Sequence, residues 1–201
     1  ATLCSNDMKS NYDRILHSVA LMAYKKLGFP DPPVLCMLRS IQNMKHYIRT
    51  AFGVSDWYVD CSDTLVPFQG VLQGNGASPT TWVIVSTPLL NMLRVAGHGG
   101  HFKSPISKEY SHIVGFSFVD DTDLVQFNML DEHISFQSIA SETQSAVDRW
   151  EGGIKATGGA LRPDKSWIYI IDFDFDTQGR WSYKHPDRIH ASFTVKDENN
   201  I

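Results

Sequence analysis

Residues 112–127 read HIVGFSFVDDTDLVQF, and this stretch does most to decide the expected fold. Val114, Phe116 and Phe118 alternate on one face of a strand predicted over residues 112–119, and a second apolar run occupies residues 124–127. Residues 120–123, between the two runs, are polar and include three aspartates. The stretch therefore predicts a β-hairpin with acidic residues at its tip, and loop tips are where functional residues gather.

Further strands are expected on both sides of this hairpin. Residues 1–4 are apolar and precede a polar segment that carries Asp7, which is typical of a buried strand ending in a carboxylate. Residues 57–60 and 167–173 also have the composition of strands. One more hairpin and a frayed tail are expected after residue 173.

Four helices are predicted from apolar residues at helical spacing. The first ends at Gly28 and the second begins at Asp31. The third begins at Ser78 after a loop over residues 68–79, and Pro88 is expected to kink or end it. The residues on the apolar faces are Ile15, Val19 and Met22 in the first helix, Val34, Leu38, Ile41 and Ile48 in the second, and Val147, Trp150 and Ile154 in the fourth.

Strands and helices alternate without an internal repeat or a Rossmann glycine signature. The predicted fold class is therefore α+β, with one mixed or antiparallel sheet covered by helices. The chain has 201 residues, of which 42% are hydrophobic and 20% charged, and this favours a single globular domain. The sequence begins without an initiator Met, and we interpret it as an excerpt of a longer protein.

Composition also narrows the setting and the partners. Cys4, Cys36 and Cys61 are widely spaced and odd in number, which predicts no disulfide framework and favours an intracellular location. The longest apolar-leaning stretch, residues 82–93, is shorter than the roughly 20 residues of a membrane-spanning helix, so no membrane partner is expected. The net charge of −4 gives no basic footprint for nucleic acid, so such a partner would have to be held locally.

The adjacent carboxylates Asp120 and Asp121 are the first candidates for chemistry. Neighbouring residues of a strand point in different directions, so only one of the two is expected to be a principal metal ligand. Two divalent ions about 3.5–4 Å apart need carboxylates from more than one strand, and Asp7 is the natural second contributor. An Asp-Asp pair is also common in simple turns, and that interpretation stays open.

Four motifs occur along the chain in an order that carries a specific resemblance. They are Asp7–Ile15, with an aromatic residue five positions after the aspartate and a second aspartate six after it, Gly70–Gly74 continuing through Ser78-Pro79, Phe118-Val119-Asp120-Asp121, and Leu161–Ser166. Read together, they resemble the palm of a reverse transcriptase, with most similarity to the non-LTR retrotransposon and group II intron types. Leu72 stands where that family often has proline.

The resemblance implies a polymerase palm, a ferredoxin-like sheet packed against helices, over residues 1–201, with fingers and thumb largely absent. It also implies RNA-directed DNA synthesis, in which a DNA primer on an RNA template is extended from dNTPs. Two Mg²⁺ ions, or Mn²⁺, would be held by Asp7 and Asp120, with Asp121 as a nearby carboxylate. Tyr12 would lie under the sugar, Gln73 and Gly74 would contact the nucleotide, and Lys165 would protonate the departing pyrophosphate or offset its charge.

Two other functions remain open for the same residues. One is an inactive relic or a nucleic-acid-binding module, and the other is a template-independent nucleotidyl transferase or cyclase on a palm fold. The individual residues also have structural interpretations. Tyr12 would be a packing residue, Gln73 a brace of its own loop, Lys165 a solvated turn residue, and Asp13 a helix or ion-pair charge.

Two further clusters resemble metal sites only superficially. Asp172, Asp174 and Asp176 alternate, but they lack the glycine and the final glutamate of a calcium loop, so a solvated edge strand is favoured. His98 and His101 flank two glycines without a third ligand nearby in the sequence, which favours a flexible surface loop.

Overall fold

The computed structural model describes residues 1–60, 69–131 and 133–199. The chain forms two compact units, one made of Ala1–Lys9 with Ser86–Ile201 and the other of Ser10–Val85. The sequence predicts one domain over residues 1–201. In the structure, the chain passes from the first unit to the second and back. Cys61 and Phe68, where the predicted loop begins, lie outside the described residues.

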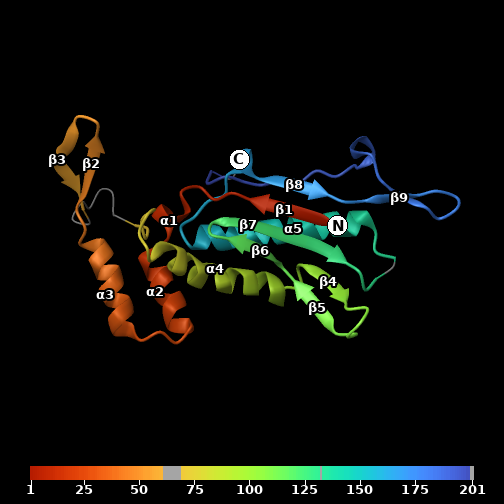
Figure 1. Cartoon of the computed structure of the whole chain (residues 1–201), viewed down its shortest axis with the longest axis horizontal. Coiled ribbons are helices and arrows are strands. Elements are labelled where there is room, and N and C mark those ends of the chain that lie inside the picture. Colours follow the sequence, from red (N-terminus) through yellow and green to blue (C-terminus); the bar gives the residue numbers. More distant parts are fainter. Residues whose placement is uncertain (61–68, 132, 200–201) are drawn as a thin grey trace. The chain divides into compact units, whose positions relative to one another are not determined.

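The first unit is built on a mixed sheet (Figure 1). Its strands are β1 (Thr2–Asn6), β4 (Gly100–Lys103), β5 (Tyr110–Ile113), β6 (Gly115–Phe118), β7 (Asp121–Asn128) and β8 (Trp167–Ile170). They lie in the order β5-β4-β7-β1-β8, and β6 also pairs with β7. The β4–β7 pairing is parallel and the others are antiparallel. The predicted hairpin is therefore present as β6 and β7, but the predicted acidic tip is wrong in part, because Asp121 and Asp123 belong to β7 and only Asp120 lies in the turn.

Helix α5 (Phe136–Ala156) packs against β1 and β7 (Figure 1). Alternate residues of both strands are buried on the side of this helix, and burying one face of a sheet against a helix is the ordinary way to build such a core. They are Thr2, Cys4 and Asn6 in β1, and Thr122, Leu124 and Gln126 in β7. Val147, Trp150 and Ile154 are at most 1% exposed, which confirms the predicted apolar face of the helix.

The first unit also contains a second, smaller sheet, two short 3-10 helices and the later part of the helix α4 (Ser78–Val95). Strands β9 (Phe173–Phe175) and β10 (Trp181–Tyr183) pair only with each other, and the 3-10 helices η1 (Pro163–Lys165) and η2 (Pro186–Arg188) flank β8 and this hairpin in sequence. The single strand predicted over 167–173 is wrong, because residues 171–172 separate β8 from β9.

The second unit contains α1 (Asn11–Arg14), α2 (His17–Lys26), α3 (Asp31–Gln42) and the hairpin of β2 (His46–Thr50) and β3 (Gly53–Val59). It also contains the beginning of α4 (Ser78–Val95), since the boundary between the units falls within that helix. Helices α2 and α3 pack together. Val34, Leu38 and Ile41 are buried as predicted.

Several predicted boundaries differ from the structure. The first predicted helix is interrupted at Ile15 and Leu16, which are extended, and Met22 is 61% exposed instead of buried. Ile48 lies in β2, because α3 ends at Gln42. Pro88 does not end α4, which continues to Val95.

The strand expected over 112–119 is divided between β5 and β6, which pair with different partners. Its Phe116 and Phe118 are 60% and 80% exposed, so the face that they share is not part of the core.

The coarse fold class is confirmed as α+β with a mixed sheet and, in the described residues, five α-helices. No helix within the described ranges combines the length and the apolar character needed to cross a membrane.

Candidate functional site

A shallow hollow on the sheet of the first unit gathers three aspartates. It has a volume of about 350 Å³ and is lined by Ser5, Asp7, Asp121, Asp123, Lys165 and Trp167. We call it the carboxylate hollow. Its residues come from the end of β1, the start of β7, and the segment from η1 into β8.

Strand register explains why these carboxylates meet. Asn6 pairs with Thr122 and Ser5 with Asp123, so Asp7 follows β1 at the point where Asp121 begins β7. Asn6 and Thr122 are buried on the side of α5. Successive side chains of a strand alternate between faces, and the aspartates on either side of them therefore project from the opposite face.

The segment that carries Lys165 is held beside Asp7 by two hydrogen bonds, one to the Asp7 carbonyl and one from the Asp7 N–H. The Arg162 N–H donates to the Asp7 carbonyl at 2.9 Å, and the Asp7 N–H donates to Ser166 Oγ at 3.4 Å. Lys165 Nζ lies 3.7 Å from Asp7 Oδ2. The Lys165 side chain is 58% exposed, and its ammonium group lies within ion-pair distance of the Asp7 carboxylate.

Asp120 occupies the two-residue turn between β6 and β7, where Phe118 pairs with Asp121. Val119, the other turn residue, has φ 58°, which is unusual for a β-branched side chain and costs roughly 1–2 kcal/mol. Such strain is often found at functional sites. Asp120 is half-buried and is not among the residues that line the carboxylate hollow.

The chemistry of the hollow suits a hard divalent cation, because carboxylate oxygens are the ligands that Mg²⁺ and Mn²⁺ prefer. Within the part of the chain that the structure describes, however, no three His, Cys, Asp or Glu side chains are grouped so that they could hold a metal ion. Asp7 and Asp121 thus supply donors of the right type from two strands, without a preassembled set of three ligands.

The other predicted site residues, Tyr12, Gln73 and Gly74, belong to the second unit. There the glycine loop is hydrogen-bonded to the segment that contains Tyr12. The Val71 N–H donates to the Tyr12 carbonyl at 2.7 Å, and the Gly70 N–H donates to the Ile15 carbonyl at 3.0 Å. The first and second motifs therefore meet through their backbones.

Side chains complete this loop. The Gln73 N–H donates to Asp13 Oδ1 at 3.3 Å, so the Asp13 side chain braces the glycine loop. The Gln73 side chain is exposed. Ser78 Oγ lies 2.5 Å from the Val71 carbonyl and 2.6 Å from that of Leu72. The loop is consequently tied at both ends, and Leu72 adopts φ 71° within it.

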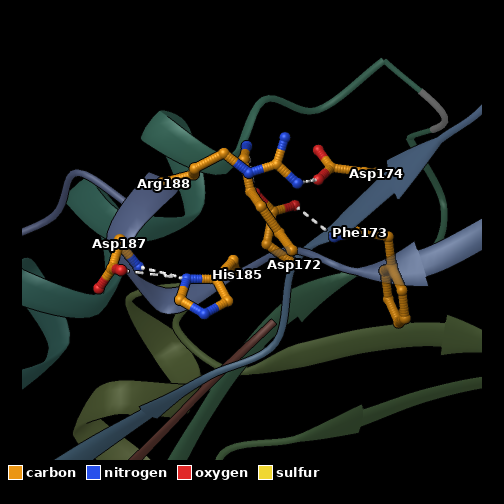
Figure 2. Close-up of polar contacts among 7 residues, drawn as sticks. Asp172, Phe173, Asp174, His185, Asp187 and Arg188 are labelled. Atoms are coloured by element: carbon orange, nitrogen blue, oxygen red, sulfur yellow. Dashed lines mark hydrogen bonds and ion pairs between the residues drawn. The ribbon is translucent and has the colours of Figure 1, made fainter.

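The aspartates at 172, 174 and 176 are ion-paired, which accounts for them without a metal. Figure 2 shows the Asp174 carboxylate facing the guanidinium of Arg188, with which it forms an ion pair. Asp172 pairs with Lys184 at 2.9 Å and Asp176 with Arg180 at 2.7 Å. Hydrogen bonds from the Arg180 backbone and side chain hold the pKa of Asp176 below its ordinary value.

The expectation of a flexible surface loop at His98 and His101 is wrong. His98 is 8% exposed, and β4 begins at Gly100. The ring of His101 stacks on that of His112 with 4.1 Å between centroids. The Gly99 N–H donates to the Gln126 amide oxygen at 2.7 Å, which joins this segment to β7.

Cys4 is not a candidate ligand or nucleophile. Its side chain is fully buried, and burial raises the pKa of the thiol to about 11. The thiol is consequently protonated at neutral pH.

Sequence reasoning missed three residues of the hollow, namely Ser5, Asp123 and Trp167. The period-2 pattern of a strand could have indicated Asp123, since it lies two residues after Asp121 and therefore on the same face. Ser5 and Trp167 are paired across β1 and β8, which no local pattern indicates. In comparisons with known proteins, the chain matches no protein-family model and no curated protein.

Proposed function

We propose that the chain is the palm core of an RNA-directed DNA polymerase of the reverse transcriptase type, of the non-LTR retrotransposon or group II intron kind. The carboxylate hollow is the observation that carries this proposal. It brings Asp7, Asp121 and Lys165 together from three separate sequence motifs. The mixed sheet with α5 on one face is compatible with a polymerase palm.

The proposed reaction is attack of a primer 3′ hydroxyl on the α-phosphate of a dNTP, with pyrophosphate leaving. Asp7, Asp120 and Asp121 would hold two Mg²⁺ ions, which when bound activate the hydroxyl and neutralise phosphate charge. Asp121 starts β7 in the hollow itself, and Asp120 lies one residue earlier in the strained turn.

The remaining roles belong to side chains that orient the substrates. Lys165, beside Asp7, would donate a proton to the departing pyrophosphate or offset its charge. Tyr12 would support the sugar of the nucleotide, and Gln73 and Gly74 would contact it. The hydrogen bonds from Val71 and Gln73 would keep the glycine loop in a fixed conformation for that contact.

The test is Mg²⁺-dependent incorporation of dNTPs on an RNA template with a DNA primer, using the protein expressed from its complete reading frame. Asp7→Asn and Asp120→Asn should each lower incorporation by about a hundredfold or more, since loss of even the supporting partners of metal ligands costs roughly 10–100-fold. Asp187→Asn is the matched control, because it removes one carboxylate that is 88% exposed and lies in η2.

The outcomes separate the three candidate functions. Incorporation that needs the template and is lost in both site variants supports the polymerase. Incorporation that is equally fast without a template supports a nucleotidyl transferase. A folded protein that binds primer-template and incorporates nothing would support the relic or binding module and overturn the proposal.

A further inference from the structure

A second hollow lies beside the carboxylate hollow and is lined by cations and acids. Its volume is about 490 Å³, and its lining residues are Lys9, Leu161, Arg162, Pro163, Asp164, Asp197 and Glu198. Lys9 Nζ and Glu198 Oε1 are only 2.6 Å apart, although 189 positions separate them in the sequence. The hollow therefore joins the start of the first motif to residues near the end of the chain.

The two cations of this hollow, Lys9 and Arg162, lie on the two segments that meet at Asp7. Met8 and Leu161 form an antiparallel bridge and are both buried. Lys9 follows Met8 and Arg162 follows Leu161, and both line the hollow, while the Arg162 N–H also donates to the Asp7 carbonyl at 2.9 Å. Asp7 also raises the pKa of Arg162, after the larger effect of its hydrogen bonds to Asp164, as expected for a nearby carboxylate.

The acidic side of the hollow is supplied by a strap, which we define as residues 191–199. Alternate residues of the strap from Ala191 to Asp197 are half-buried, as in an extended chain lying on a surface. Thr194 is fixed to α5 by two hydrogen bonds with the Gln144 side chain, at 2.8 and 2.9 Å. Phe193 and Val195 line a further hollow with Pro163 and Trp167.

The strap changes the sign of the charge in the hollow. Lys9 and Arg162 face one carboxylate, that of Asp164, when only the residues outside the strap are considered. Asp197 and Glu198 add two more negative charges and leave the hollow with an acidic excess. Lys9 and Glu198 are 41% and 34% exposed, so water screens their ion pair and a stronger anion can displace the carboxylate.

We propose that Lys9 and Arg162 form a binding site for a polyphosphate, and that Glu198 is its intramolecular competitor. The Glu198 carboxylate pairs with the Lys9 ammonium group, and a polyphosphate oxygen would take its place because a polyphosphate carries more negative charge. The polyphosphate is either free pyrophosphate or the triphosphate of a nucleotide. The site extends the proposed function, because it borders Asp7 and would take the anion that nucleotidyl transfer releases.

The test is the affinity of the full chain for inorganic pyrophosphate, measured by isothermal titration calorimetry at low ionic strength with a chelator present. Glu198→Gln should tighten binding by about two- to fivefold, the range expected when an exposed ion pair is removed. Lys9→Gln should weaken binding, and Lys9→Arg should retain it because the positive charge remains. In the double variant Lys9→Gln/Glu198→Gln, the gain from Glu198→Gln should disappear.

Glu109→Gln is the matched control, since it removes the same charge from an exposed position next to β5 in the same unit. Equal tightening by Glu109→Gln and Glu198→Gln would show a general charge effect and overturn the proposal. Pyrophosphate binding that Lys9→Gln leaves unchanged would also overturn it.

A second titration with dTTP separates the two sources of polyphosphate. Binding that depends on Lys9 with pyrophosphate alone supports a product site, and the same dependence with both ligands supports a site for the triphosphate. Because no template, primer or metal is present, failure of this test is distinct from failure of the polymerase proposal.

Discussion

Gly70 and Gly74 share a left-handed backbone but differ in their surroundings. Gly70 has φ 96°, and a Cβ added there would lie 2.5 Å from the Asp13 backbone. Gly74 has φ 89°, and an added Cβ would meet nothing within 4 Å. The pair therefore separates the cost of backbone conformation from the cost of a close contact between two segments.

Gly70→Ala should lower the free energy of unfolding by more than Gly74→Ala. Gly74→Ala carries only the left-handed penalty of roughly 1–2 kcal/mol. Gly70→Ala carries the same penalty and must also push the glycine loop away from Asp13, at a further cost of at least about 1 kcal/mol. Urea unfolding of both variants measures the difference, and equal losses would contradict the close approach.

Helix α5 is the element whose sequence and structure agree best. Its predicted apolar residues are buried, and its first turn has a capping residue, since Ser135 Oγ accepts a hydrogen bond from the Ser138 N–H at 3.1 Å. A cap of this kind satisfies one of the N–H groups that have no partner within the helix. Both features are local, and for that reason a short stretch of sequence can indicate them.

Ser135→Ala should destabilise the protein by about 1 kcal/mol, because the Ser138 N–H loses its acceptor. Ser135→Asp should retain most of the stability, since an aspartate oxygen can accept the same bond and carries a favourable charge at a helix N-terminus. Denaturation followed by circular dichroism measures both. A Ser135→Ala variant as stable as the natural protein would show that the hydrogen bond contributes nothing.

The hairpin of β2 and β3 was missed as a hairpin for a physical reason. Most of its residues are exposed on both faces, so its sequence has no alternation of apolar and polar side chains.

The interruption between α1 and α2 has a different cause. The Ile15 carbonyl accepts its hydrogen bond from Gly70, a tertiary partner that local periodicity cannot report.

At the scale of the whole molecule, the buried imidazole of His98 makes the free energy of unfolding depend on pH. Burial lowers the pKa of His98, the Arg149 charge lowers it further, and the Glu142 carboxylate partly opposes them. The unfolded chain, with an ordinary histidine pKa near 6.5, therefore binds a proton more readily than the folded protein does. His98 therefore makes its full contribution to the free energy of unfolding above about pH 6.5, the ordinary histidine pKa. The contribution falls as the pH decreases below that value.

His98→Gln should reduce the loss of unfolding free energy between pH 7.5 and pH 5.5, about one unit on either side of the ordinary histidine pKa. Urea unfolding at the two values measures the change, and the comparison with the natural protein removes the contribution of other titrating groups. His190→Gln, which removes an imidazole from an exposed position in the same unit, is the matched control. A His98 variant with the pH dependence of the natural protein would contradict the assignment.

The sequence by itself indicated the α+β class, the β6–β7 hairpin, the buried face of α5 and the order of the motifs. The hairpin and the buried helix face depend on side-chain periodicity and turn chemistry within about 20 residues, which a linear pattern records directly. It also indicated Asp7, Asp121 and Lys165 separately, without a measure of their proximity.

Only the tertiary structure decided which of these residues meet. Pairing between β1 and β7 places Asp7, Asp121 and Asp123 on one face, and a slip of one residue would have turned them toward α5. The division into two units and the contact of Glu198 with Lys9 likewise join segments far apart in the chain. Such contacts depend on how much apolar surface each arrangement of the whole chain buries, and no local stretch contains that information.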